Sequence, residues 1–340
     1  MPDKPKLAMY WGAACGGCEI STLNIGDKIL IVDEVFDLAF FPCIADFKTQ
    51  DVINYPDGYI DVCLYNGAIR NSDNEEMAHL LRKKSKVLVA FGSCAYEGCI
   101  PALSNLTSKD ATFNTVYFDN LTIDNPDRRL PEENYQVPEG ALTLPAFYNT
   151  VKSLDQVVPV DYYIPGCPPE SEMIWAVLEV VVNALLHGGP LPPAGSVIGA
   201  GNVAVCEQCP LEKNVKSISR FYRPQDIIPE PGLCLLEQGI VCMGPATRSG
   251  CGALCPQVGM RCEGCYGPLE GVIDQGAKML SAIASVVGVG QAGEEEAELN
   301  RKIGEVMDTL ADPAGTFYRF SMAHSILHRV KVSGNGSNGG

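Results

Sequence analysis

Cysteines carry most of the chemistry that this sequence offers, and eight of the fifteen lie between residues 206 and 265. This stretch contains no histidine. Four thiolates hold one [4Fe-4S] cube, and Cys-x-x-Cys pairs joined to more distant cysteines through Gly and Pro are typical of chains that wrap such cubes. The eight residues therefore predict two cubes. They are Cys206, Cys209, Cys234, Cys242, Cys251, Cys255, Cys262 and Cys265.

Structural zinc held by four cysteines is the alternative interpretation of the same residues. Such zinc sites usually alternate two compact Cys-x-x-Cys knuckles, whereas the spacings here are irregular and a further set of cysteines lies upstream. The pattern therefore favours iron-sulfur clusters. A zinc-bound chain would instead be a colourless interaction scaffold without a redox role.

Four upstream cysteines each follow a predicted strand. Cys15 and Cys18 come after the strand at 6–11 in a glycine-rich turn, Cys94 after the strand at 86–91, and Cys167 after the strand at 160–164. We expect these loops to meet at one edge of a sheet and to form a third set of four ligands. The alternative is a group of ordinary core cysteines, because free cysteine is among the most buried residue types.

The elements that must position this third set alternate along the chain. Further strands are predicted at 37–41 and 60–65, and helices from the glycine-rich turn through Leu30, at 73–84 and at 170–187. Alternation of this kind predicts an α/β fold with a parallel sheet covered by helices on both faces. Ligands of such sheets bind beyond the carboxyl ends of the strands, which is where a flavodoxin-like fold holds FMN.

The three remaining cysteines have weaker patterns. Cys43 and Cys63 lie in apolar runs and are predicted to be inert core thiols. Cys99 follows Cys94 by only five residues and competes with it as a ligand. Cys94 is favoured because its Gly-Ser-Cys turn comes directly after the strand.

The length of the chain and its Gly- and Pro-rich breaks predict four parts. Residues 1–195 form a flavodoxin-like domain, 196–270 an irregular iron-sulfur domain, 271–333 a C-terminal helical extension and 334–340 a disordered tail. Helices are expected in the extension near 272–287, 294–310 and 317–328. The polar stretch 103–144 is predicted to be a surface insertion that either docks a partner or only covers the body.

The composition argues against several classes of partner. The net charge of -16, from 25 Lys and Arg against 41 Asp and Glu, leaves few basic residues for nucleic acid or anionic membranes. The apolar run at 176–186 is too short to cross a bilayer, and no leader pattern precedes the first strand. We therefore expect a cytoplasmic protein with reduced cysteines.

The motifs taken together resemble the small subunit of [NiFe] hydrogenases, and most closely its F420-non-reducing (methyl-viologen-reducing) branch, which is associated with heterodisulfide reductase. The likeness covers nearly the whole chain. It lies in Trp11-Gly-Ala-Ala-Cys15-Gly-Gly-Cys18-Glu19, Gly92-Ser-Cys94-Ala, Pro165-Gly-Cys167-Pro-Pro and the eight downstream cysteines.

The resemblance implies an electron-transferring subunit with three [4Fe-4S] clusters beside a large subunit that holds the NiFe centre. It also implies a [2Fe-2S] delta-type subunit and heterodisulfide reductase as partners. An F420-reducing hydrogenase or a sulfhydrogenase is the alternative within the same class. By motif position the ligands would be Cys15, Cys18, Cys94 and Cys167 for the proximal cluster, Cys206, Cys209, Cys234 and Cys242 for the distal cluster, and Cys251, Cys255, Cys262 and Cys265 for the medial cluster.

Some details depart from relatives of this kind or stay open. Many respiratory members have a histidine where Cys206 stands, so all-thiolate ligation is expected here, with a lower potential. Cys234 and Cys242 could exchange between the two downstream clusters. Arg248-Ser-Gly-Cys251 only faintly resembles the nickel motif of the large subunit, so no nickel is expected in this chain. Glu19 is either a contact for the large subunit or a first-turn carboxylate of its helix.

The four histidines, His79, His187, His324 and His328, show no ligand spacing with the cysteines and are expected at the surface or at helix ends.

Overall fold

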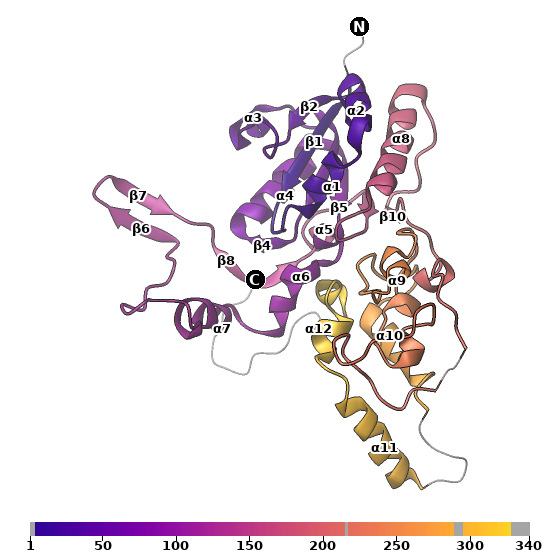
Figure 1. Cartoon of the computed structure of the whole chain (residues 1–340). Helices are drawn as coiled ribbons and strands as arrows, with labels where there is room; N and C mark the ends of the chain where they lie inside the picture. The colour runs from indigo at the N-terminus through magenta and orange to yellow at the C-terminus, as the bar shows by residue number, and fades with distance from the viewer. Residues whose placement is uncertain (1–3, 215–216, 289–294, 328–340) are drawn as a thin grey trace.

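The computed structural model describes residues 4–214, 217–288 and 295–327. A six-stranded parallel sheet forms its centre, in the order β10-β9-β5-β3-β1-β2 (Figure 1). The strands are β1 (Lys6–Trp11), β2 (Asp37–Phe40), β3 (Ile60–Asn66), β5 (Ser85–Phe91), β9 (Tyr162–Ile164) and β10 (Ser196–Val197). Apart from the short added strand β10, this is the strand order of flavodoxin-like sheets. The predicted α/β class and its five strands are confirmed.

Alternate residues of the strands bury two different apolar faces. Leu64 and Val89 point to the face covered by α1 (Gly17–Leu23), α2 (Ile29–Val35) and α8 (Ser171–His187). Tyr65 and Leu88 point to the opposite face, which is covered by α3 (Thr49–Asn54) and α4 (Ser72–Lys84). Burial on both faces requires continuous apolar runs such as the one in β5. The sheet is therefore a rigid frame, and the loops that follow the carboxyl ends of its parallel strands lie at the same edge.

The helix predicted to run through Leu30 is divided in the structure. It consists of α1, the 3-10 turn η1 (Gly26–Lys28) and α2. Gly26 has a φ of 67°, which a continuous helix does not allow. The break lets α2 turn so that Val32 packs on the sheet.

The insertion after α5 (Ser93–Glu97) and α6 (Cys99–Ala102) has little core of its own. It contains η2 (Leu103–Leu106), α7 (Lys109–Asn114), the π-helical turn η3 (Thr115–Asp119) and the hairpin of β6 (Asn134–Val137) and β7 (Gly140–Thr143). The hairpin projects away from the body (Figure 1), and most of its side chains are exposed. The chain returns through β8 (Phe147–Lys152), which pairs with β4 (Ile69–Asn71), and then η4 (Leu154–Gln156). Its role as a docking or a covering element stays a prediction.

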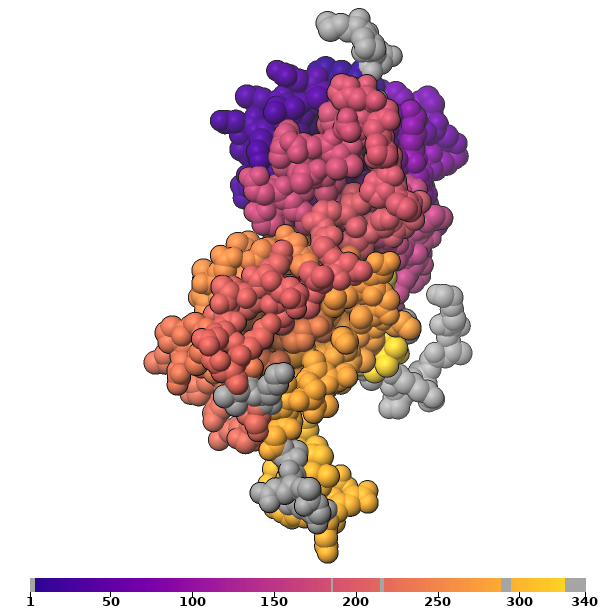
Figure 2. Space-filling view, turned by 90° about the vertical axis from the view of Figure 1, so that its right-hand side faces the viewer, coloured from indigo at the N-terminus to yellow at the C-terminus, as the bar shows by residue number. Residues whose placement is uncertain are grey.

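The region from residue 198 onward packs below the sheet domain and has few regular elements (Figure 2). These are η5 (Val205–Glu207), η6 (Leu236–Gln238), η7 (Gly244–Ala246) and α9 (Leu254–Gln257), followed by α10 (Gln275–Ala284), α11 (Glu296–Asp308), α12 (Pro313–Phe317) and η8 (Met322–His324). Met279 of α10 and Phe317 of α12 share one core with Val205 and Leu236. The domain limits near 195 and 270 stay predictions, although β10 extends the sheet to Val197.

The helix predicted at 317–328 is wrong within the described residues. Helix α12 ends at Phe317 and the chain continues through turns to η8. The reason is tertiary, because Met322 enters the core beneath the cysteines while Phe320 packs against Cys94 and Cys99. No straight helix reaches both places. His328 lies outside the described residues. In the part of the chain that the structure describes, no helix has the length and hydropathy needed to span a membrane.

Candidate metal centres

The loops after β1, β5 and β9 bring four predicted ligands together at one sheet edge. Cys18 is the second residue of α1 and is 7% exposed, and Cys94 in α5 is 8% exposed. Burial raises the pKa of the Cys18 thiol, and the charges of Cys94, Glu19, Cys167 and Cys15 raise it further. The other three thiols therefore lie around Cys18, as the sequence predicted for a sheet-edge group.

Glycines let the backbone approach these sulfurs closely. A Cβ on Gly92, whose φ is 80°, would lie 2.4 Å from the Sγ of Cys18. The amide of Gly17 donates a hydrogen bond to the Sγ of Cys15 at 3.4 Å. A thiolate is stabilised by such amide donors, so the turn suits deprotonated sulfur.

Cys99 lies next to this group. It is fully buried, has a φ of 49°, and its thiol donates to the Sγ of Cys167 at 3.6 Å. Hydrogen bonds to Cys167 and Cys94, together with burial, raise the pKa of Cys99, while the same bond lowers the pKa of Cys167. The group therefore contains a fifth thiol, and the competition between Cys94 and Cys99 stays open.

The other two cysteines differ from each other. Cys63 is fully buried in the core beneath α4, as predicted. The prediction for Cys43 is wrong, because this thiol is exposed. Strand β2 ends at Phe40, and after the buried Phe41 the chain turns outward, so Pro42, Cys43 and Ile44 are exposed.

A second group of four thiols consists of Cys206 and three thiols around it. Burial, followed by the charges of Cys242, Cys234 and Cys209, raises the pKa of Cys206 to about 12 against the opposing charge of Lys213. A Cβ on Gly244 would lie 3.0 Å from the Cys206 Sγ and 3.7 Å from the Cys242 Sγ. The four residues that the resemblance assigns to the distal cluster thus lie together.

The third group lies between the other two. Burial raises the pKa of Cys265 to about 12 against a hydrogen bond from the backbone of Cys167, and Cys251 and Cys255 act on the same thiol. Burial also raises the pKa of Cys262, and the charge acting on it most strongly belongs to Cys242. The amide of Cys262 donates to the Cys242 Sγ at 3.3 Å. The medial residues therefore touch the first group through Cys167 and the second through Cys242.

The donor set suits iron-sulfur clusters chemically. All twelve predicted ligands are thiols, and none is in a disulfide. In the described ranges, no three side chains of His, Cys, Asp or Glu converge as a single metal ion requires. A cube makes a different demand, since each of its four thiolates binds a different iron. Burial raises the pKa of several of these thiols, Cys18, Cys206, Cys262 and Cys265 among them, and binding to iron would offset the cost of ionising them.

Hydrogen bonds of Ser93 join the sheet domain to the downstream cysteine region beside the first group. This residue was not identified from the sequence. Ser93 donates through Oγ to the carbonyl of Cys265 and accepts from the amide of Gly166 at 3.2 Å. Its place in Gly92-Ser-Cys94 was the available signal. Glu19 is in the first turn of α1 and is 5% exposed, with both carboxylate oxygens accepting from Asn66 at 2.8 Å.

The histidines follow their prediction only in part. His79 is exposed and His187 is the last residue of α8. His324 is the last residue of η8, which agrees with the expected helix end, but its side chain is half-buried and contacts Asp155 and Ser153. The tertiary fold places it against η4.

Comparisons with known proteins give the family. Residues 15–181 match the family described as NADH ubiquinone oxidoreductase, 20 Kd subunit. The iron-sulfur subunit of the F420-non-reducing hydrogenase of Archaeoglobus profundus is 38% identical over 83% of this chain and 88% of its own length. The corresponding F420-non-reducing hydrogenase subunit of Methanothermobacter marburgensis is 38% identical over 98% of this chain and its full length.

A solved structure shares the fold. The [NiFeSe] hydrogenase of Dm. baculatum has a TM-score of 0.50 at 19% identity, over 84% of this chain and 99% of that chain. At this identity the likeness shows the fold alone. The two relatives that are 38% identical over most of the chain show the family. This chain belongs to the small subunits of [NiFe] hydrogenases, in the F420-non-reducing branch.

Proposed function

We propose that the chain is the electron-transferring subunit of a cytoplasmic [NiFe] hydrogenase and serves an iron-sulfur or flavin partner of the heterodisulfide reductase type. Family membership implies iron-sulfur clusters in this chain and a large subunit with the NiFe centre as its partner. The number of clusters, their order and the acceptor are the proposal. Each [4Fe-4S] cluster would supply one-electron redox chemistry at low potential.

The continuous row of thiol groups is the observation that supports this function. The backbone of Cys167 lies close enough to the Cys265 thiol to counter part of the rise in its pKa, and the Cys262 amide donates a hydrogen bond to the Cys242 Sγ. The three thiol groups therefore adjoin one another, which supports the proposed order of proximal, medial and distal clusters. A structural zinc protein has no need for such contacts, whereas electron transfer depends on closely spaced centres.

The proposed ligand sets follow the three groups. Cys15, Cys18, Cys94 and Cys167 would hold the proximal cluster, Cys251, Cys255, Cys262 and Cys265 the medial cluster, and Cys206, Cys209, Cys234 and Cys242 the distal cluster. The charge of Cys234 raises the pKa of both Cys206 and Cys242, which supports the place of Cys234 in the distal set. Cys262 lies next to Cys242 of the distal set and Cys265 of the medial set, so its assignment to one of the two clusters is the least constrained by these contacts.

The acceptor is proposed on the relatives' names and on charge. They are called F420-non-reducing, which favours an acceptor other than F420. We propose a [2Fe-2S] delta-type subunit and heterodisulfide reductase as the electron-accepting partners. The net charge of -16 suits a protein partner better than a nucleic acid or an anionic membrane.

Substitution at the two ends of the row tests the function. Cys15→Ser should abolish hydrogen-dependent reduction of every acceptor, since the proximal group is the entry point. Cys209→Ser should reduce activity with the protein acceptor more than with methyl viologen, because a small dye can collect electrons earlier in the row. Both rates are measured on purified complex under hydrogen. Equal losses with both acceptors in Cys209→Ser would contradict the proposed order.

A further inference from the structure

A polar cavity of about 110 Å³ lies where three distant segments meet, beside the cysteine groups but with no cysteine in its lining. Tyr96 and Glu97 of α5 contribute one wall, Gln275 at the start of α10 another, and Ser321, His324 and Ser325 a third. The volume is enough for a few water molecules or an ion and too small for a typical organic ligand.

Three oxygen atoms of its lining residues are buried and have no hydrogen-bond partner in the described part of the chain. They are Glu97 Oε2, Gln275 Oε1 and Ser321 Oγ. The three residues are 1%, 1% and 3% exposed. Buried polar atoms are nearly always satisfied, so three orphans from one cavity indicate a missing partner. Because a carboxylate and an amide carbonyl only accept, that partner must be a donor or a cation.

The surrounding structure holds two of these oxygens in place. The Nε2 of Gln275 donates to Thr247 Oγ1 at 3.2 Å and to the carbonyl of Gly264 at 2.9 Å, so both amide hydrogens are used and a flip would lose them. A Cβ on Gly267, whose φ is 73°, would lie 2.7 Å from Glu97 Oε2. Glycine at this position lets the backbone close over the carboxylate.

Glu97 also lacks a partner of opposite charge within ion-pair distance among the described residues. Its surroundings contain Arg248, whose Nε donates to the carbonyl of Pro268, and His324, which is paired with Asp155. Burial raises the pKa of Glu97 to about 7, despite the opposing charges of His324 and Arg248. A buried carboxylate in this state needs either a proton or a nearby cation.

We propose that this cavity binds a monovalent metal cation, sodium or potassium, through the oxygens of Glu97, Gln275 and Ser321 with water completing the shell. Oxygen donors select hard cations. A single carboxylate balances one positive charge, and the nearby guanidinium of Arg248 disfavours an ion with a second charge. The bound ion would join α5, α10 and the C-terminal segment, and it would do so whatever route electrons take through the cysteine groups.

Thallium(I) is the direct probe, because it replaces potassium and scatters anomalously. Crystals of the intact hydrogenase grown in thallium acetate should show an anomalous peak within bonding distance of all three oxygens. The absence of a peak there, with only water in the density, would overturn the proposal.

Thermal unfolding of the same complex tests the ion in solution. At equal ionic strength, sodium or potassium chloride should raise the midpoint over choline chloride by about 2–4 °C in a saturable way. Glu97→Gln should remove this difference, whereas Glu139→Gln, at an exposed position of the hairpin, should keep it. Equal midpoints of wild type in all three salts would refute the site. The thallium result on wild type stands by itself if Glu97→Gln does not fold.

Discussion

Single side chains around the first cysteine group decide which sulfurs can reach a cluster. Cys99 is fully buried and adjoins both Cys94 and Cys167, so its position resembles that of a ligand. The charge of Cys94, however, raises the pKa of Cys18, so these two thiols lie close together. Gly92, two residues before Cys94, packs closely against the Cys18 sulfur. This geometry favours Cys94 as the ligand and Cys99 as a hydrogen-bond donor to Cys167.

Replacing the two thiols separately tests that assignment. Wild type should contain about twelve irons and twelve sulfides per chain, as three cubes require. Cys94→Ser should lose about four of each, and Cys99→Ser should keep the full number, with an altered electron paramagnetic resonance spectrum of the reduced proximal cluster. Iron, sulfide and zinc analysis of anaerobically prepared protein gives the counts. Loss of iron in Cys99→Ser with retention in Cys94→Ser would reverse the assignment, and zinc without sulfide would remove the clusters altogether.

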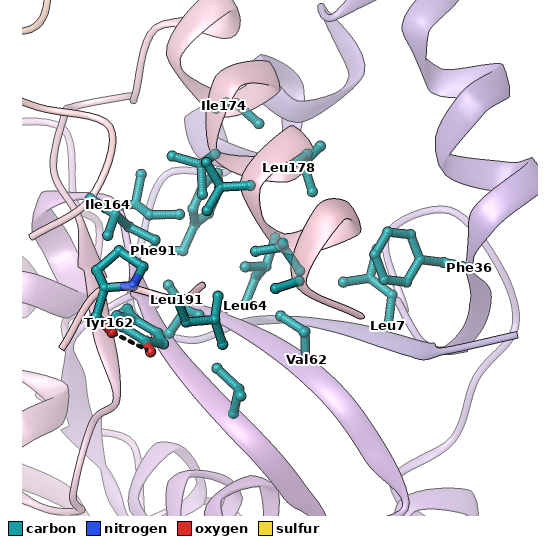
Figure 3. Close-up of a pocket in the computed structure, with 18 residues that line it drawn as sticks. Leu7, Phe36, Val62, Leu64, Phe91, Tyr162, Ile164, Ile174, Leu178 and Leu191 are labelled. Atoms are coloured by element: carbon teal, nitrogen blue, oxygen red, sulfur yellow. Dashed lines mark hydrogen bonds between the residues drawn. The ribbon is translucent and has the colours of Figure 1, made fainter. Parts of the chain in front are cut away.

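At the scale of elements, α8 follows the loop that carries Cys167 out of strand β9. It begins four residues after Cys167 and packs across one sheet face, where a small apolar crevice remains beside Leu178 and Ile174 (Figure 3). Leu178 is 7% exposed, while Leu186 on the same helix is 48% exposed. Anchoring of this helix therefore fixes the backbone that carries one predicted ligand.

Leu178→Ala should lower the free energy of unfolding by about 2–5 kcal/mol, since it removes buried methyl groups and enlarges the crevice. Leu186→Ala is the matched control and should change it by less than about 0.5 kcal/mol. Anaerobic thermal unfolding of both variants makes the comparison. Similar losses in both would show that α8 is not held by its buried face.

At the scale of the whole molecule, the C-terminal segment ties the cysteine region to the sheet domain. His324 Nε2 contacts Asp155 Oδ1 at 2.9 Å and Ser153 Oγ at 2.8 Å, and Gln156 Nε2 donates to the carbonyl of Ala323 at 2.8 Å. Burial opposes the charged imidazole, but the hydrogen bond and charge of Asp155 outweigh it and raise the pKa of His324. Burial likewise opposes ionisation of Asp155, and the His324 interaction leaves its pKa lowered.

These shifts predict how stability depends on pH. The contribution of His324 is fully present below its unfolded pKa of about 6.5 and is lost as pH rises through the higher folded value. The contribution of Asp155 is present above its unfolded pKa and is lost as pH falls through the lower folded value. The difference in unfolding midpoint between wild type and His324→Gln should therefore be largest near about pH 6 and smaller near about pH 9. A difference that grows towards alkaline pH would contradict the ion pair.

Much of this architecture follows from local pattern. Apolar runs separated by helical stretches specify a parallel sheet, and sheet geometry alone requires Cys15, Cys18, Cys94 and Cys167 to meet at the carboxyl edge. Likewise, the irregular Cys-x-x-Cys spacing after residue 205 indicated two groups of four thiols. The sheet was predicted correctly because strand period is a short-range property of the chain, whereas the division of the cysteines among clusters stays a prediction.

Other features depend on contacts between segments far apart in the sequence. Cys43, which is exposed, and Cys63, which is buried, both lie in apolar runs, and they differ because strand β2 ends at Phe40, before Cys43. The turns after Phe317 and the inward place of His324 arise from packing against distant partners that local periodicity cannot specify. The contacts between the thiol groups, and the cavity at Glu97, likewise depend on tertiary structure. Both form where segments that are far apart in the sequence meet.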